Sequence, residues 1–308
     1  MNLAASISQA VQSIPMPGTA YREITPGRIL HVDGDYAAYY HSGKDDTHWT
    51  KGRDEFLDRI RNARIATGSE FVIVHLSAPG CSKGDRFEVS FTKPYQGQRH
   101  SDKPANWQAM RDFMAAPNPA FKLRVWEDRE ADDGIALHCT ARAERGGLDA
   151  IHTRDKDFRM FPGIHLDWTT FSTLEVPLNA FEMYGNNGKM FGHKWFWTQM
   201  LWGDGADNIP GLKGVGEKKA YDALRGVRDN ADAERVVLEL YRAKLGPLWA
   251  ATYVEQAALL WMRNDADASL LNFLQVMTPS AEVMDAAAAM ADRVQKIKDE
   301  VASYGNQD

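Results

Sequence analysis

Acidic residues follow three separate strand-like segments of this chain, and this arrangement most constrains the fold. Asp33 ends the segment 28–33 (RILHVD), EADD follows 122–126 (KLRVW), and RDKD follows 149–153 (DAIHT). In an open α/β sheet the carboxyl ends of parallel strands meet at one edge, where ligands bind. We therefore expect three groups of carboxylates to face one crevice.

Helical and strand-like patterns alternate through the first half of the chain. Residues 53–67 have helical spacing, 71–76 (FVIVHL) form a continuous apolar strand, and 132–145 are helical up to two glycines. This alternation predicts an α/β fold with a parallel central sheet flanked by helices. We expect an N-terminal arm at 1–27, a catalytic core at 28–192, and a helical region at 193–308.

A long basic segment at about 78–119 interrupts this alternation. Residues 79–125 carry eight Lys or Arg against four Asp or Glu, although the whole chain has a net charge of −6. Setting aside the eight acids assigned to metal below leaves a net charge of +2. Long connections in compact domains are usually functional or disordered, so we expect this segment to meet an anionic partner.

Carboxylates gathered at one edge need cations, because like charges raise one another's pKa. Oxygen ligands alone favour Mg²⁺ or Mn²⁺, and their number suits two ions that clamp the attacking and leaving oxygens of a phosphodiester. Taken singly, Asp132 and Asp133 fit helix N-caps equally well, and Asp157 fits a solvated turn. The recurrence at three strand ends favours the metal site.

A glycine-rich turn follows the sheet, in LWGDGADNIPGLKGVGEKKAYDAL at 201–224. Two acids three residues apart open it, glycines form the turn, and two lysines begin the next helix. Such a turn presents free backbone N–H groups to phosphates and reads no base sequence. A plain helix–turn–helix connection is the alternative for this text in isolation. The residues concerned are Asp204, Asp207, Gly211, Gly214, Gly216, Lys218 and Lys219.

Four motifs together resemble the flap-endonuclease superfamily of 5′-nucleases, and most of all the 5′→3′ exonucleases of tailed bacteriophages. They are VDGDYAAY, EADDGIA, TRDKDF and GDGADNIPGLKGVGEKKA, within about residues 28–225. The resemblance implies a PIN/FEN-like fold with a basic helical arch and a helix–three-turn–helix DNA clamp. It also implies two-metal hydrolysis of DNA phosphodiesters, as a 5′→3′ exonuclease or flap endonuclease, to 5′-phosphate and 3′-hydroxyl products.

The resemblance assigns roles to individual residues. Asp33, Glu130, Asp132 and Asp133 would hold the first metal, and Asp155, Asp157, Asp204 and Asp207 the second. Lys83, Arg86, Lys93 and Arg99 would contact phosphates from the arch, where Tyr95 would meet DNA. The aromatic residues there, Phe87, Phe91 and Tyr95, could stack bases or pack beneath the arch. Gly211, Gly214, Gly216, Lys218 and Lys219 would form the clamp, with a monovalent cation as a further candidate ligand.

Two positions depart from the family pattern. The family carries an Asp after its second strand, where this chain has His75, Ser77 and Ala78. The family's YKxxR element reads YQGQR, so Gln96 replaces a lysine whose charge Lys83 or Lys93 would supply. These departures leave the reaction class in place but open the identity of one metal ligand and of the electrophilic lysine.

The expected partner is DNA with a free 5′ end or a 5′ flap, with an RNA·DNA hybrid as a further candidate. No apolar run approaches the roughly 20 residues of a membrane span. Residues 1–18 lack signal-peptide features and two cysteines are too few for a disulfide framework, so we expect a cytoplasmic protein. The alternatives are a non-catalytic structure-specific DNA-binding relative, a PIN-like RNase and, more remotely, a magnesium-dependent phosphatase.

Overall fold

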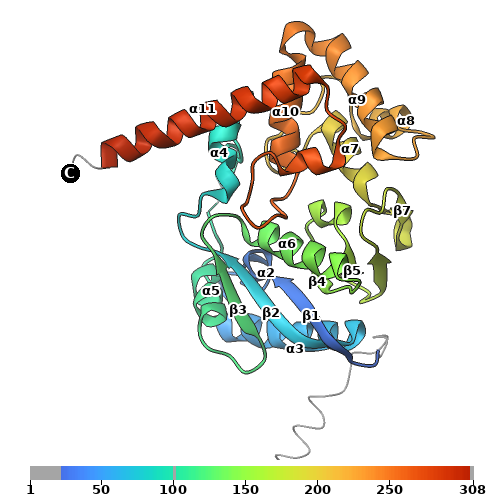
Figure 1. Ribbon diagram of the computed structural model, residues 1–308. Helices are drawn as coiled ribbons and strands as arrows, with labels where there is room; N and C mark the ends of the chain where they lie inside the picture. Colours follow the sequence, from blue (N-terminus) through green and yellow to red (C-terminus); the bar gives the residue numbers. More distant parts are fainter. Residues whose placement is uncertain (1–21, 100–101, 306–308) are drawn as a thin grey trace, which may run out of the picture.

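The computed structural model describes residues 22–99 and 102–305 and contains a six-stranded sheet in the order β3-β2-β1-β4-β5-β6 (Figure 1). The strands are β1 (Thr25–Asp33), β2 (Ser69–Ser77), β3 (Lys122–Trp126), β4 (Ala150–His152), β5 (Gly163–Leu166) and β6 (Thr173–Val176). All neighbours pair in parallel except β5 and β6. The predicted α/β class is confirmed. The first strand starts at Thr25, inside the expected arm, and residues 1–21 of that arm lie outside the described residues.

The chain order reverses between β1 and β4, which are neighbours in the sheet. Asp33 pairs in register with His75 of β2, and Val32 with His152 of β4. The strand ends therefore lie level at one edge, beside the switch point at which open α/β sheets bind ligands.

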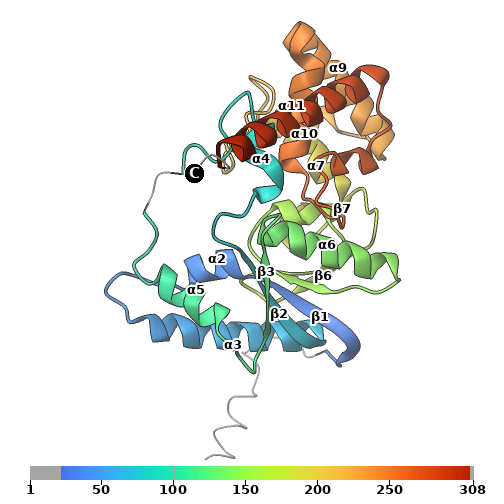
Figure 2. The ribbon, with the colours of Figure 1, turned by 60° about the vertical axis from the view of Figure 1, so that its left-hand side comes forward.

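Helices cover both faces of the sheet (Figures 1 and 2). One face packs against α2 (Gly34–Tyr40) and α3 (Trp49–Thr67), and α5 (Trp107–Ala115) packs against these two helices. The other packs against α6 (Ala131–Glu144). Alternation along β1 explains this division, because Leu30 and Val32 join the α3 core whereas His31 stacks on His138 of α6.

The basic segment 78–119 is divided between two parts of the molecule. It begins with η1 (Lys83–Asp85) and α4 (Arg86–Val89), which lies against α10 and α11, and it ends with α5. The described residues between them, 90–99 and 102–106, form neither helix nor strand. The segment expected as a helical arch therefore has its helices at its two ends, since prolines and glycines interrupt the stretch between them and Met110 and Met114 bury α5 in the core.

The second half of the chain is largely helical. After the hairpin of β7 (Met183–Tyr184) and β8 (Met190–Phe191) come α7 (His193–Trp202), α8 (Glu217–Ala223), α9 (Asn230–Leu245), α10 (Trp249–Leu260) and α11 (Ala281–Gly305). Short 3₁₀ turns lie at η2 (Asp157–Met160), η3 (Asn186–Gly188), η4 (Gly246–Leu248) and η5 (Asn272–Val276). Figure 1 shows α11 running across α10 to α4, where Lys298 Nζ lies 3.0 Å from Asp85 Oδ2. Among the described helices, none is both long and apolar enough to cross a membrane.

Candidate metal centre and nucleic-acid interface

The three acidic motifs open onto one cavity of about 920 Å³ at the carboxyl edge of the sheet. We call it the acidic crevice. Asp33, Glu130, Asp132, Asp155 and Asp207 line it, with basic and aromatic residues from the segment 78–119 on its other side. The structure thus brings together acids from three strand ends and from the glycine-rich turn, as the sequence predicts.

Asp33 is held at the junction of β1 and α2. Its Oδ1 accepts the backbone N–H of Tyr36 at 2.9 Å, and its Oδ2 accepts the hydroxyl of Thr153 at 2.9 Å. Thr153 Oγ1 also accepts the backbone N–H of Asp155 at 3.0 Å, so one threonine connects two motifs. Burial raises the pKa of Asp33 to about 7. A nearby cation would oppose this effect by favouring the charged carboxylate.

The first cluster consists of Glu130, Asp132 and Asp133, whose ligand oxygens lie within 4.8 Å of one another. It forms where β3 passes into α6, and the backbone N–H of Glu130 donates to Asp133 Oδ2 at 3.1 Å. Burial raises the pKa of Asp132 well above its usual value, and the charges of Glu130 and Asp133 add to the effect. This local excess of negative charge is what a divalent ion would neutralise.

Asp133 already has partners within the protein. Arg86 donates to its two oxygens at 2.7 and 2.6 Å, and the backbone N–H of Arg263 donates at 2.8 Å. Although burial alone would raise it, Arg86 holds the pKa of Asp133 below its usual value. Arg86 is 3% exposed, so the expected phosphate contact of this residue does not fit its position. Metal binding by Asp133 remains a prediction.

The second cluster joins Asp157 to Asp204 and Asp207 of the glycine-rich turn, again with oxygens within 4.8 Å. Asp204 begins a tight turn, with its N–H and C=O both paired with Ile209 at 2.8 Å. Gln199 of α7 donates to Asp157 Oδ1 at 2.6 Å. Burial raises the pKa of Asp157 well above its usual value, and the charge of Asp155 adds to it.

Asp155 connects the two clusters electrostatically. Burial is the largest cause of its raised pKa, and the charges of Asp207 and Asp204 add to it. In turn, the charge of Asp155 contributes to the raised pKa of Asp132. The donor set consists of oxygen atoms only, buried and mutually repulsive, and this chemistry fits two hard divalent ions better than any softer metal.

The basic side chains that the sequence predicts to contact phosphates differ in their position relative to the crevice. Lys83 Nζ lies 3.2 Å from Glu130 Oε1 and donates to Gln96 Oε1 at 2.7 Å. The sequence left open whether Lys83 or Lys93 supplies the charge missing at Gln96, and Lys83 is the one that reaches this position. Arg99 is 2.6 Å from Asp207 Oδ1. Lys93 is exposed and lies outside the crevice lining.

Tyr95 has a different position from the one expected of a base-stacking residue. Its side chain is buried, and its hydroxyl lies 3.0 Å from Glu130 Oε2 and 3.4 Å from Asp207 Oδ2, with one proton to donate between them. The ring therefore offers no free face to a base and instead ties an acid of the first cluster to one of the second. Phe87 and Phe91 are the exposed aromatic side chains of this segment, at 50% and 49%.

The glycines of the turn between α7 and α8 are not equivalent. A Cβ on Gly211 would lie 2.2 Å from the carbonyl carbon of Trp202, so this glycine permits close packing of the turn. Gly214 and Gly216 have no heavy atom within 4 Å of such a position, so their backbone is open to a ligand. Lys218 and Lys219 are exposed beside them. Lys219 Nζ donates to Gly214 O at 2.8 Å.

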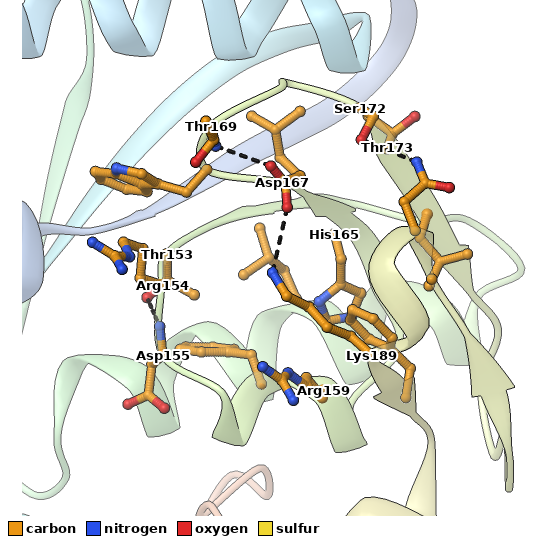
Figure 3. Close-up of a pocket in the computed structure, with 18 of the residues that line it drawn as sticks. Thr153, Arg154, Asp155, Arg159, His165, Asp167, Thr169, Ser172, Thr173 and Lys189 are labelled. Atoms are coloured by element: carbon orange, nitrogen blue, oxygen red, sulfur yellow. Dashed lines mark hydrogen bonds and ion pairs between the residues drawn. The ribbon is translucent and has the colours of Figure 1, made fainter. Parts of the chain in front are cut away.

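A second cavity of about 420 Å³ adjoins the acidic crevice and shares Arg154 and Asp155 with it (Figure 3). Arg159 and Lys189 also line it, and Lys189 is 3.4 Å from Asp167. The sequence did not single out these basic residues, because the predicted site was built on the acids beside them. The position of Arg154 in the motif TRDKDF, and of Arg159 directly after it, was the available signal.

Lys156 is another residue that sequence reasoning missed. Its ammonium lies 2.6 Å from Asp204 Oδ2 and 3.7 Å from Asp157 Oδ1, inside the second cluster. Asp35, which follows Asp33 and Gly34, also lines the acidic crevice. Both lie within or next to predicted motifs, but only the folded chain shows which acids they meet.

Comparisons with known proteins find similarity to a DNA polymerase I and to a flap endonuclease. Residues of the chain are 31% identical over 142 residues to DNA polymerase I of Bacillus caldotenax, and 29% identical over 147 residues to the flap endonuclease Xni of Shewanella amazonensis. These matches cover 42% and 45% of this chain, but 15% and 55% of those proteins. The chain thus matches less than two thirds of each relative. No protein-family model matches it.

Solved structures share the fold along nearly the whole chain. The T5 D15 protein co-crystallised with metal ions has a TM-score of 0.52 and 17% identity, over 90% of this chain and 98% of that one. A complex of the T5 D15 flap endonuclease with DNA and metal ions has a TM-score of 0.52 and 15% identity, over 91% and 100%. The chain therefore has the fold of the bacteriophage T5 flap endonuclease, and the PIN/FEN-like prediction is confirmed.

Proposed function

We propose that this protein is a divalent-metal-dependent 5′-nuclease that hydrolyses DNA phosphodiesters. The observation that carries the proposal is the pair of carboxylate clusters, each with oxygens within 4.8 Å, which meet one crevice at the switch point of the sheet through Glu130, Asp132 and Asp207. The similarity to flap endonuclease Xni over 147 residues supports the same reaction class.

The residues present suit the chemistry of phosphodiester hydrolysis. Two Mg²⁺ or Mn²⁺ ions, held by Glu130 and Asp132 on one side and by Asp157, Asp204 and Asp207 on the other, would neutralise the charge of the attacking and leaving oxygens. Lys83, already beside Glu130, would turn from Gln96 to a phosphoryl oxygen. The products would carry a 5′-phosphate and a 3′-hydroxyl.

The clamp and the basic side of the crevice would hold the DNA backbone. Gly214 and Gly216 leave room for a phosphate beside Lys218 and Lys219. These contacts reach phosphates and not bases, so binding would depend on DNA shape and 5′ ends and not on sequence. A monovalent cation at this turn, action on an RNA·DNA hybrid, and a cytoplasmic location remain predictions.

The test is cleavage of 5′-labelled DNA by the purified protein. A flapped duplex, a blunt duplex, a single strand, an RNA·DNA hybrid and a single-stranded RNA would each be incubated with Mg²⁺, with Mn²⁺ and with EDTA. We expect metal-dependent release of short 5′ products from DNA, abolished by Asp155→Asn with Asp157→Asn and kept by Asp222→Asn on exposed α8. The preferred DNA would separate exonuclease from flap activity. Cleavage of the RNA strand alone would indicate the PIN-like alternative.

One observation keeps a non-catalytic DNA-binding role as a second candidate. The ammonium of Lys156 already neutralises part of the second cluster, at 2.6 Å from Asp204. If this contact persists with DNA bound, the second ion has no site. DNA binding that falls with salt, without cleavage in either metal, would establish this role and overturn the nuclease proposal.

A further inference from the structure

The end of β2 lacks an acid of its own, although its two neighbours in the sheet are followed by carboxylates. β2 ends at Ser77, between Asp33 at the end of β1 and the acids that follow β3. The side chain of His75 lies on the face of the sheet that α6 covers. There it hydrogen-bonds to His31 at 2.9 Å and accepts the indole N–H of Trp126 at 3.0 Å. The strand therefore supplies no metal ligand to the crevice.

Asp35 takes up this position from a different element. Its Oδ2 accepts the backbone N–H of Ser77 at 3.0 Å, and the hydroxyl of Ser77 accepts the N–H of Ala131 at 2.9 Å. Ala131 lies between Glu130 and Asp132, so one serine connects Asp35 to the first cluster.

The sequence permits this arrangement through the glycine of VDGD. A Cβ on Gly34 would lie 2.5 Å from the carbonyl oxygen of His75 and 2.8 Å from the side chain of Leu76. Only glycine lets α2 approach β2 this closely. The close approach is what brings the next residue, Asp35, to the N–H of Ser77.

Arg111 of α5 fixes the carboxylate of Asp35. One guanidinium nitrogen donates to Asp35 Oδ1, and another donates to Ser77 O at 2.6 Å. The side chain of Asp35 is 32% exposed and lines the acidic crevice. Asp133, by contrast, is fully buried and bonded to Arg86 and Arg263. Asp35 thus keeps an open side toward the crevice.

We propose that Asp35, the sixth carboxylate that lines the acidic crevice, fills the empty end of β2 from α2 and helps to hold the cation of the first cluster. Arg111 is its positioning residue. The inference rests on the proposed function, since it assigns a further ligand to the same centre. It explains how a carboxylate lies beside the end of β2, although β2 itself carries no acid there.

Binding of Mn²⁺ to the DNA-free protein tests the proposal without reference to activity. Electron paramagnetic resonance of free Mn²⁺ gives the affinity and number of sites. Asp35→Asn keeps the size of the side chain and an acceptor for Ser77, and we expect it to weaken one site by about 10- to 100-fold. Asp46→Asn removes an equal charge from the exposed segment after α2 and should leave both sites unchanged.

Arg111→Met distinguishes metal binding by Asp35 from a purely structural role of Asp35. If Asp35 binds the ion, Arg111→Met keeps the carboxylate and weakens Mn²⁺ binding less than Asp35→Asn does. If Asp35 only anchors α5, both variants lower the melting temperature alike and bind Mn²⁺ as tightly as the wild type, which overturns the proposal.

Cleavage by the wild type, measured in parallel, separates this inference from the proposed function. A wild type that cleaves DNA, with an Asp35→Asn variant that binds Mn²⁺ normally, would refute only the role of Asp35. If Asp35→Asn lowers the Mn²⁺ affinity but the wild type does not cleave DNA, only the nuclease proposal is refuted. A wild type that binds no Mn²⁺ would refute both.

Discussion

The ammonium of Lys156 lies 2.6 Å from Oδ2 of Asp204, where a divalent ion would bind the second cluster. Burial opposes the charged form of this lysine, but Asp157 and Asp204 outweigh it and raise the pKa of Lys156 above its usual value. The chain thus carries its own counter-cation for this cluster. A metal ion that enters the second cluster must displace this ammonium or share its ligands.

Lys156→Met should therefore tighten Mn²⁺ binding at the second cluster and lower the melting temperature in EDTA. Removing the ammonium abolishes the competition but leaves the acids unbalanced when no metal is present. Calorimetric titration with Mn²⁺ and thermal melts in EDTA measure the two effects. Lys189→Met, which breaks the pair with Asp167 outside both clusters, is the control. Weaker Mn²⁺ binding by Lys156→Met would mean that this lysine supports the metal site.

The buried pair of Arg86 and Asp133 should make a large contribution to folding. Asp133→Asn removes the bidentate partner of a buried guanidinium, which then keeps only Glu130 Oε2 at 3.4 Å as an ionic partner, and breaking such a pair from one side costs about 3–5 kcal/mol. Urea unfolding measures this loss. Arg99→Gln breaks an ion pair whose arginine is 54% exposed, and should cost at most about 1 kcal/mol. A double variant, Arg86→Met with Asp133→Leu, should recover much of the lost stability. A small cost for Asp133→Asn alone would contradict this account.

The part of the centre that depends on short-range pattern was predictable. Strand type, strand order in the chain and the acid after each strand follow from neighbouring residues, and parallel register then places Asp33, Glu130 and Asp155 at one edge. The contacts of Asp35 were not predictable, because Ser77 is 42 residues away and no local pattern indicates how closely α2 approaches β2.

The basic segment 78–119 shows why charge alone was a poor guide. Arg86 counts toward the basic character of the sequence, but its partner Asp133 lies 47 residues away and removes it from the surface. Tyr95 is similarly turned inward toward Glu130. The buried Met110 and Met114, four residues apart, were the available sign that α5 packs into the core.

Mg²⁺ should stabilise the folded protein, because only the folded chain brings the clusters together. An ion present at 100 times its dissociation constant adds about 2.7 kcal/mol for each site. Thermal melts in EDTA and in rising Mg²⁺ should show a saturable increase in melting temperature. Asp155→Asn should reduce this increase, since Asp155 interacts with both clusters. An identical increase in this variant would show that Mg²⁺ acts elsewhere.

The clamp lysines should contribute to DNA binding through counterion release. Replacing Lys218 with Gln should lower the slope of log affinity against log salt by about 0.9, if this exposed side chain meets one phosphate of duplex DNA. Fluorescence anisotropy with a flapped duplex in EDTA measures the slope without cleavage. Arg235→Gln on α9, where Arg235 pairs with Asp232, serves as the control. Equal slopes for wild type and Lys218→Gln would exclude a phosphate contact there.

Buried neutral histidines should make the fold sensitive to mild acid. His152 is 1% exposed, stacks on Trp168 with ring centroids 4.6 Å apart, and has no hydrogen-bond partner among the described residues. Burial lowers its pKa from 6.5 to about 3. Between these values the unfolded chain binds the proton and the folded chain does not. Stability is therefore complete above pH 6.5 and falls as the pH drops toward 3, by about 1.4 kcal/mol per unit for one such group.

His152→Leu should remove this dependence while keeping an apolar side chain beside Trp168. Urea unfolding at pH 8 gives the packing cost of the substitution, because the histidine is neutral in both states there. Between pH 6.5 and 5 the wild type should lose about 1.4 kcal/mol per unit more than the variant, so their free energies of unfolding converge or cross. Parallel curves for the two proteins over this interval would show that His152 takes up its proton without unfolding, which would contradict this account.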